Sequence, residues 1–213
     1  MPPAASRPAV AGYAALVEAI AGRRSIRRYR PERPTRALID ALLQVATSAP
    51  SAHNRQPWRF RVLIDDAEKA ALAEAMGARL TRDRLADGDA EDLVAADAAR
   101  SRQRIAEAPA IVVVCLSMAD MDRYPDLRRN RAEYLMAVQS VAMAGQNLLL
   151  ASHAAGLGAC WLCAPLFCPG VACQVLDLPD DWQPQGLITL GYPADAGKPF
   201  VRHPLDRVRR PSP

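Results

Sequence analysis

The sequence Pro50-Ser-Ala-His-Asn-Arg-Gln-Pro-Trp58 places a hydroxyl, an imidazole and two side-chain amides between two prolines. Proline restricts the backbone on both sides, so these groups are carried on a stiffened loop. Such a loop suits a flat heteroaromatic ligand with polar edges. The alternative is a surface turn whose side chains satisfy only the local backbone.

A second polar motif, Arg23-Arg24-Ser25-Ile26-Arg27, lies upstream of this loop. The usual nucleotide fingerprints are missing, because Gly156-Leu-Gly-Ala-Cys-Trp161 has tryptophan where the dinucleotide motif needs its third glycine, and there is no Walker loop. A phosphate ligand would therefore be held by side chains, and the arginine fork makes paired, charge-assisted bonds to phosphate oxygens. The alternative is a solvated basic helix end.

The segments around these motifs predict alternating helices and strands. Apolar residues at helical spacing predict a first helix over Tyr13–Ala21 that ends near Gly22. Thr35 is placed to cap a second helix, which Pro50 closes, and residues 49–58 then form a loop. The alternation over residues 59–64 predicts a strand, and Asp65 or Asp66 begins the next helix.

The core is expected in the middle of the chain. Ala110–Leu116 is a nearly unbroken apolar run, which is typical of a central strand covered on both faces. Arg131–Ala154 keeps helical periodicity and predicts a buried central helix. The remaining expected elements are a short turn and strand over residues 156–162, a helix over Pro169–Leu176 and a last strand over Gln185–Tyr192.

The other segments are polar or rich in proline. Residues 79–107 are short of large apolar side chains, so any helix there is expected to be exposed or mobile, and this segment is a candidate lid. Residues 1–10 are expected to be a flexible tail, and residues 11–213 a single domain. Residues 197–213 are interpreted as a basic, proline-rich tail without helix or strand.

The composition excludes several functional classes. Half of the residues are hydrophobic and 23% are charged, as in a soluble globular protein. The net charge is +4, but the arginines are mixed with acids along most of the chain, which argues against nucleic acid as a partner. No secretory signal or membrane span is recognised, so we expect a cytoplasmic protein that does not bind membranes. Only three histidines are present and no nucleophile elbow, so a hydrolytic triad is not expected.

The cysteines raise a separate possibility. Cys160, Cys163, Cys168 and Cys173 are spaced closely enough to suggest a metal-binding module. Their neighbours are mostly apolar, however, and buried cysteine behaves as a small hydrophobic residue, so core packing is the favoured interpretation. The count of five is odd and favours reduced thiols.

Arg-Arg-Ser-x-Arg followed by Pro-Ser-x-x-Asn-x-Gln-Pro-Trp resembles the nitroreductase family. The sequence Gly-Leu-Gly-Ala-Cys-Trp161 and the late Arg202 fit the same family, so the resemblance extends from Tyr13 to Arg207. It implies an α+β fold, a nitroreductase-like three-layer α/β/α sandwich, in an interlocked homodimer with FMN at the interface. It also implies hydride transfer from NADH or NADPH, through FMN, to a small-molecule acceptor such as a nitro compound or a quinone.

The resemblance also assigns residues to the cofactor. Contacts to the phosphate, the ribityl chain or the pyrimidine edge are implied for Arg23, Arg24, Ser25 and Arg27, and a second contact to the phosphate is implied for Arg202. Contacts to the isoalloxazine, some of them from the other subunit, are implied for Ser51, Asn54 and Gln56, in a loop that also includes Pro50, Ala52 and His53. One side of the ring would be packed by Cys160, Trp161 and Leu162, for which core packing is the alternative. No catalytic side chain is expected, because the flavin carries the chemistry.

The second half, from Glu133 to Trp182, looks like the flavin-binding reductase domain of deazaflavin-coenzyme biosynthesis proteins. That subgroup reduces a dehydro precursor of the coenzyme. Its members are commonly fused to a ligase domain, and we expect none within these 213 residues, which weakens the transfer of the substrate. Because of the resemblance over residues 133–182, reduction of such a precursor remains an alternative to the reduction of nitro compounds or quinones.

Overall fold

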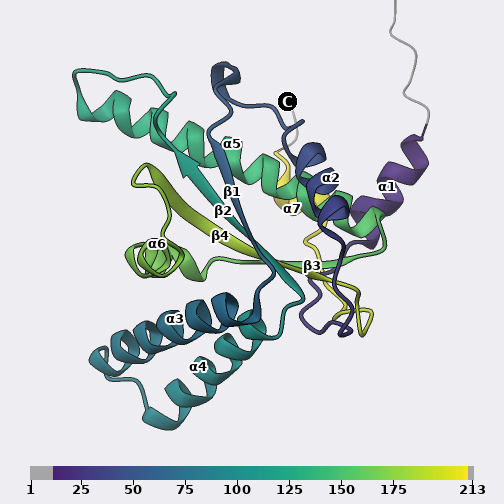
Figure 1. The fold of residues 1–213 in the computed structure, drawn as a ribbon. Coiled ribbons are helices and arrows are strands. Elements are labelled where there is room, and N and C mark those ends of the chain that lie inside the picture. The colour runs from purple at the N-terminus through teal and green to yellow at the C-terminus, as the bar shows by residue number, and fades with distance from the viewer. Residues whose placement is uncertain (1–11, 211–213) are drawn as a thin grey trace, which may run out of the picture.

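The computed structural model describes residues 12–210 of the chain. The expected flexible tail, residues 1–10, lies outside the described residues. Figure 1 shows the elements in the order α1 (Tyr13–Gly22), α2 (Arg36–Ala46), η1 (Ala52–Asn54), β1 (Trp58–Leu63), α3 (Asp66–Ala86), α4 (Glu91–Ala106), β2 (Ala110–Ser117), α5 (Leu127–Ala154), β3 (Gly158–Leu162), η2 (Ala164–Phe167), α6 (Pro169–Leu176), β4 (Trp182–Gly191) and α7 (Leu205–Val208).

The four strands form one antiparallel sheet in the order β1-β2-β4-β3. Strand β2 has both of its edges paired, and all eight of its residues are buried. Its alternate side chains enter two different cores: Val112 and Val114 belong to one cluster, and Ile111 and Val113 to the other. The prediction of a central strand covered on both faces is therefore confirmed.

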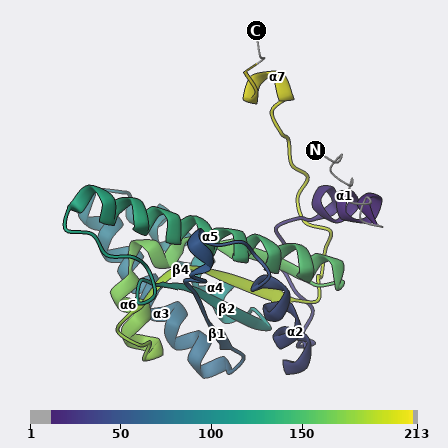
Figure 2. The same cartoon turned by 90° about the horizontal axis from the view of Figure 1, so that it is seen from above.

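Helices cover both faces of this sheet, which gives three layers (Figures 1 and 2). On one face, α2 and α5 pack through Ile39, Leu42 and Leu148. On the other face, α3, α6 and the end of α4 contribute Leu72, Ala172 and other side chains to the second cluster. The predicted α+β class and its three layers agree with this arrangement.

Helix α5 is the longest of the described helices and begins four residues before its predicted start. Its N-cap is Asp126, whose side chain accepts a hydrogen bond from the amide of Arg129. By length and composition α5 could span a membrane, but it packs along the sheet and buries residues such as Val141, Ala144 and Leu148 in the core. A core helix of a globular domain has these properties as well.

Four predictions need correction. The strand expected at residues 59–64 is Trp58–Leu63, and the last strand begins three residues before Gln185. Residues 79–107 hold the end of α3 and all of α4, and α4 buries Val94, Ala98 and Ile105, so the expected exposure is wrong for this face of α4. The tail after residue 197 contains the short helix α7.

Candidate functional site

A basic pocket forms where the segment that follows α1 meets the segment that follows β4. Its volume is about 220 Å³, and it is lined by Arg23, Arg24, Ser25, Arg27, Lys198, Pro199, Phe200 and Arg202. We call these eight residues the arginine pocket. The structure therefore brings the early arginine motif and Arg202 of the tail to one pocket, which is the proximity that the family resemblance implies.

The early motif is held against the sheet by backbone contacts. Ser25 forms a bridge with Ala159 of β3, and the amide of Ile26 donates to the Ala159 carbonyl at 3.1 Å. Gly158 is required for this approach, because a Cβ there would lie 2.7 Å from Cβ of Ile26. The hydroxyl of Tyr29 donates to the Ile26 carbonyl at 2.7 Å, and burial raises the pKa of Tyr29.

The charges of the pocket are uncompensated. No carboxylate lines it, and within residues 12–210 none of its arginines, nor Lys198, forms an ion pair. The neighbouring Arg28 differs, since it pairs with Asp195 at 2.8 Å. Unpaired guanidinium groups around one pocket form a binding site for an anion such as a phosphate.

Arg24 has a structural role as well. Its Nη1 donates to the carbonyls of Ala21 and Gly22 at 2.7 and 2.9 Å, and so closes the end of α1. Its guanidinium also stacks 4.3 Å from the ring centroid of Phe200, and that of Arg202 lies 4.0 Å from the same ring. Arg24 therefore caps the end of α1, as the alternative interpretation of the motif expected, and it also lines the arginine pocket.

The loop of residues 50–58 is anchored to α5. The amide of Ala52 donates to the Ser140 hydroxyl at 3.2 Å, and the amide of Gln56 donates to the Ser51 hydroxyl at 3.0 Å. The backbone angle φ is near +50° at three residues of this loop, namely His53, Asn54 and Gln56. This left-handed backbone is unusual for residues other than glycine and often marks a functional loop.

The loop and the arginine pocket lie apart in one chain. The loop contacts α5 at Ser140, whereas Gly22, just before the arginines, faces His153 of the same helix. His153 follows Ser140 by 13 positions, a rise of about 20 Å along a helix. One chain therefore does not bring the two predicted halves of the site together.

Strand β3 holds the third predicted group. Cys160 is buried, and burial raises the pKa of its thiol. The indole of Trp161 contacts Gly145 of α5 and Gly186 of β4, and Leu162 packs against the second core cluster. These three side chains therefore contribute to packing, and β3 is an edge strand that pairs with β4 along one side.

Comparison with known proteins decides the family. Residues 20–192 match the nitroreductase family. This chain belongs to the nitroreductase family. An NADH dehydrogenase of Thermus thermophilus is 32% identical over 210 residues, which cover 87% of this chain and 90% of the relative.

Two further members of the nitroreductase family extend the comparison. A protein of Methanothermobacter thermautotrophicus, assigned as NADH dehydrogenase/NAD(P)H nitroreductase, is 30% identical over 84% of this chain and 78% of its own length. A crystal structure of an assigned nitroreductase from Desulfovibrio desulfuricans, in complex with FMN, is 27% identical with a TM-score of 0.70, and the match covers 93% of this chain and 96% of that one. The nitroreductase-like fold predicted from the sequence motifs is therefore confirmed.

The cysteines of this nitroreductase-family chain do not gather around one point. Cys168 and Cys173 belong to the second core or its margin, whereas Cys163 is exposed, so the expectation that it packs in the core is wrong. Within residues 12–210 the cysteines form no group of three donors close enough to share an ion. The metal-binding module proposed from their spacing is not supported by this geometry.

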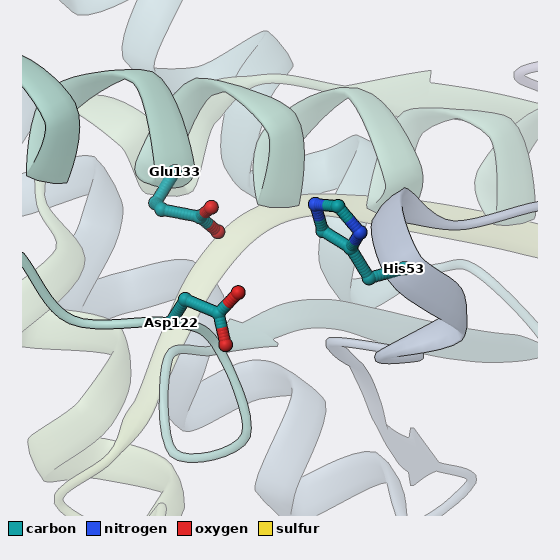
Figure 3. A group of neighbouring side chains, drawn as sticks. All are labelled: His53, Asp122 and Glu133. Carbon is teal, nitrogen blue, oxygen red and sulfur yellow. The ribbon is translucent and has the colours of Figure 1, made fainter.

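Sequence reasoning missed two residues beside His53. Asp122, before α5, and the buried Glu133, on α5, have carboxylate oxygens within 4.8 Å of each other and of a ring nitrogen of His53 (Figure 3). Arg55 Nη2 donates to Asp122 at 2.5 Å. No motif links positions 53, 122 and 133, because the group forms only when the loop docks on α5.

Proposed function

We propose that this chain is an FMN-dependent oxidoreductase that takes a hydride from NADH or NADPH and passes it to a small organic acceptor. The observation that carries the proposal is the arginine pocket, whose unpaired basic side chains suit a dianionic phosphate. Membership of the nitroreductase family, the FMN in the Desulfovibrio desulfuricans relative and the NADH and NAD(P)H in the names of the other relatives support it.

The residues present fit FMN in the following way. Arg23, Arg27 and Arg202 would hold the phosphate, and the exposed amides of Asn54 and Gln56 would meet the polar edges of the ring. When bound, FMN accepts the hydride from the donor and returns it to the acceptor. The chain supplies position and charge, which requires no nucleophilic side chain.

We further propose a homodimer in which the arginine pocket of one chain lies beside the loop of its partner. The separation of these two parts along α5 supports it, and so does unpartnered apolar surface. Helix α1 buries none of its residues, and Leu16, Val17 and Ile20 are each 44–54% exposed. Val201 in the tail is 94% exposed. These are the surfaces that an interlocking partner would cover.

The remaining parts of the proposal concern the cellular location, the partners and the electron acceptor. Five free cysteines support a reducing compartment, and we place the enzyme in the cytoplasm with no nucleic-acid or membrane partner. The acceptor is proposed to be a nitro compound or a quinone. A dehydro precursor of a deazaflavin coenzyme is the second candidate acceptor, and the sequence between Glu133 and Trp182 is what favours it.

The test is the absorbance spectrum of the purified protein, with the released cofactor identified by mass, before and after anaerobic addition of NADH or NADPH. We expect FMN in near-stoichiometric amount and bleaching by at least one donor. FMN that is not bleached by either donor would reject the nicotinamide step. Absence of flavin would reject the whole proposal. Reoxidation of the reduced enzyme by menadione, a nitroaromatic compound or a deazaflavin precursor then ranks the acceptors.

A further inference from the structure

Glu133 is a buried carboxylate that lacks a full set of partners. The residue is 2% exposed, and within the described chain its Oε2 is buried without a hydrogen bond. Removing a carboxylate from water is costly unless a counter-charge or hydrogen bonds compensate for the lost hydration. The structure therefore places an unsatisfied negative group on α5, directed at the loop of residues 50–58 (Figure 3).

Two further donors lie near the Glu133 carboxylate. His53 comes from η1 and Asp122 from the segment between β2 and α5, and one ligand atom from each lies within 4.8 Å of the others and of Glu133. Figure 3 shows the imidazole and both carboxylates pointing toward a common space. The loop of residues 50–58 thus contributes one donor, and α5 and the segment that precedes it contribute the other two.

We propose that His53, Asp122 and Glu133 form a binding site for a divalent cation of the zinc class. One imidazole with carboxylates is a donor set that zinc and related transition metals accept, whereas magnesium and calcium prefer oxygen donors alone. Zinc bonds of about 2.0–2.2 Å place donors roughly 3.4 Å apart in a tetrahedron, so side-chain rotations that shorten the distances between the donors by up to about 1.4 Å complete the site. Three protein donors leave the fourth position open to water.

Arg55 is suited to orient one ligand of this site. Its Nη2 holds Oδ1 of Asp122 at 2.5 Å, and Oδ2 of Asp122 has no hydrogen bond within the described residues. Such outer partners fix ligating carboxylates in place. With a neutral imidazole, the two carboxylates and Arg55 sum to one negative charge, which a divalent cation would more than offset.

The ion would connect the loop to α5. His53 and its neighbours Asn54 and Gln56 hold left-handed backbone conformations, and coordination of one ion by both His53 and Glu133 would hold that conformation in place. The donors of this site are distinct from the proposed phosphate site in the arginine pocket, although Asn54 and Gln56 of the same loop are proposed to meet the flavin ring. Metal binding can therefore be measured whether or not flavin is present.

The experiment is calorimetric titration of Zn²⁺ into chelator-treated, full-length protein, with FMN content and melting temperature recorded on the same samples. We expect one high-affinity Zn²⁺ per chain and a rise in the melting temperature. Glu133→Gln and His53→Ala should each weaken Zn²⁺ binding at least about tenfold, since the loss of even an outer partner of a ligand costs that much. Glu133→Gln should also leave the metal-free protein at least as stable as the wild type, because the uncompensated charge is removed.

Matched variants separate this site from adventitious binding. Asp120→Asn changes an exposed carboxylate in the same segment, His203→Ala an exposed imidazole, and Cys163→Ser an exposed thiol, and all three should bind Zn²⁺ as the wild type does. The proposal fails if no stoichiometric Zn²⁺ binds, or if binding is unchanged in both Glu133→Gln and His53→Ala. Because His53 is exposed, its variant tests the site even if Glu133→Gln does not fold.

Discussion

Trp161 packs directly on the bare backbone of Gly145. A Cβ built at Gly145 would lie 2.3 Å from Cζ3 of the indole, and one built at Gly186 would lie 2.6 Å from Cε2. The indole is therefore in close contact with α5 and with β4. The glycine that interrupts an otherwise strong helical sequence is there because this ring occupies the space of its side chain.

Gly145→Ala should destabilise the protein and displace Trp161. Overpacking typically lowers the free energy of unfolding by about 1–3 kcal/mol. The better helix propensity of alanine offsets up to about 1 kcal/mol of this loss. Urea unfolding and tryptophan fluorescence measure both effects. Gly170→Ala in α6 is the matched control, because its Cβ meets nothing within 4 Å, and it should be neutral or stabilising. Equal free energies of unfolding for the two variants would contradict the close contact between Gly145 and the Trp161 indole.

Much of the fold could be predicted because its signals are local. Thr35 caps α2 through the amide of Leu38, and Pro169 opens α6, as the sequence indicated. The apolar run of β2 predicts its burial without reference to any other segment. These features depend on neighbours in the sequence, so one sequence suffices to find them.

The errors arise where distant residues decide the outcome. Residues 79–107 look exposed because their arginines and aspartates dominate the composition, yet ion pairs such as Arg79 with Asp83 hold those charges on the surface while Val94 and Ile105 are buried. Cys163 follows a strand of core residues but lies at the turn into η2 and is exposed. Glu133 looks like an ordinary helix surface residue until the loop of residues 50–58 docks beside it.

Arg23→Ala should weaken FMN binding by about tenfold to a hundredfold, because a hydrogen bond to a charged group contributes about 1.5–3 kcal/mol. Arg23 is the informative position, since Arg24 also closes α1 and its loss would affect folding. Arg28→Ala is the control, because Arg28 pairs with Asp195 and does not line the pocket. The dissociation constant is measured by flavin fluorescence quenching. Equal effects at positions 23 and 28 would reject the phosphate site.

Mixed dimers test whether two chains build one site. Chains carrying Arg23→Ala and chains carrying Asn54→Ala would each have two defective sites as homodimers. A heterodimer would have one intact site and one doubly defective site if the arginine pocket and the loop of different chains meet. We therefore expect refolded mixtures to recover FMN binding and NAD(P)H oxidation above either variant alone. Absence of recovery in verified heterodimers would show that each site uses a single chain.

The two cysteines flanking η2 should respond differently to substitution. Cys168 is 5% exposed in the second core, and its thiol donates to the Ala164 carbonyl at 3.6 Å, so Cys168→Ser should cost about 1 kcal/mol, the low end for a buried hydroxyl, because this acceptor compensates in part. Cys163 is exposed, and Cys163→Ser should change the free energy of unfolding by less than about 0.5 kcal/mol. Urea unfolding under reducing conditions compares them. A larger cost at Cys163 would mean that it is covered in the assembled protein.

Asp126 should make the stability of α5 depend on pH. Hydrogen bonds from the amide and side chain of Arg129 lower the pKa of its carboxyl in the folded protein. A carboxyl with a lowered folded pKa contributes stability at pH values above its unfolded pKa of about 3.9, and the contribution is lost as pH falls through the folded pKa.

Asparagine also caps helices but does not titrate in this range. Asp126→Asn should therefore reduce the fall of the urea midpoint between about pH 5 and pH 2, while Asp126→Ala should lower the midpoint throughout. An unchanged slope in Asp126→Asn would assign the acid sensitivity to other carboxyls, such as Asp66 and Asp195, whose pKa values are also lowered.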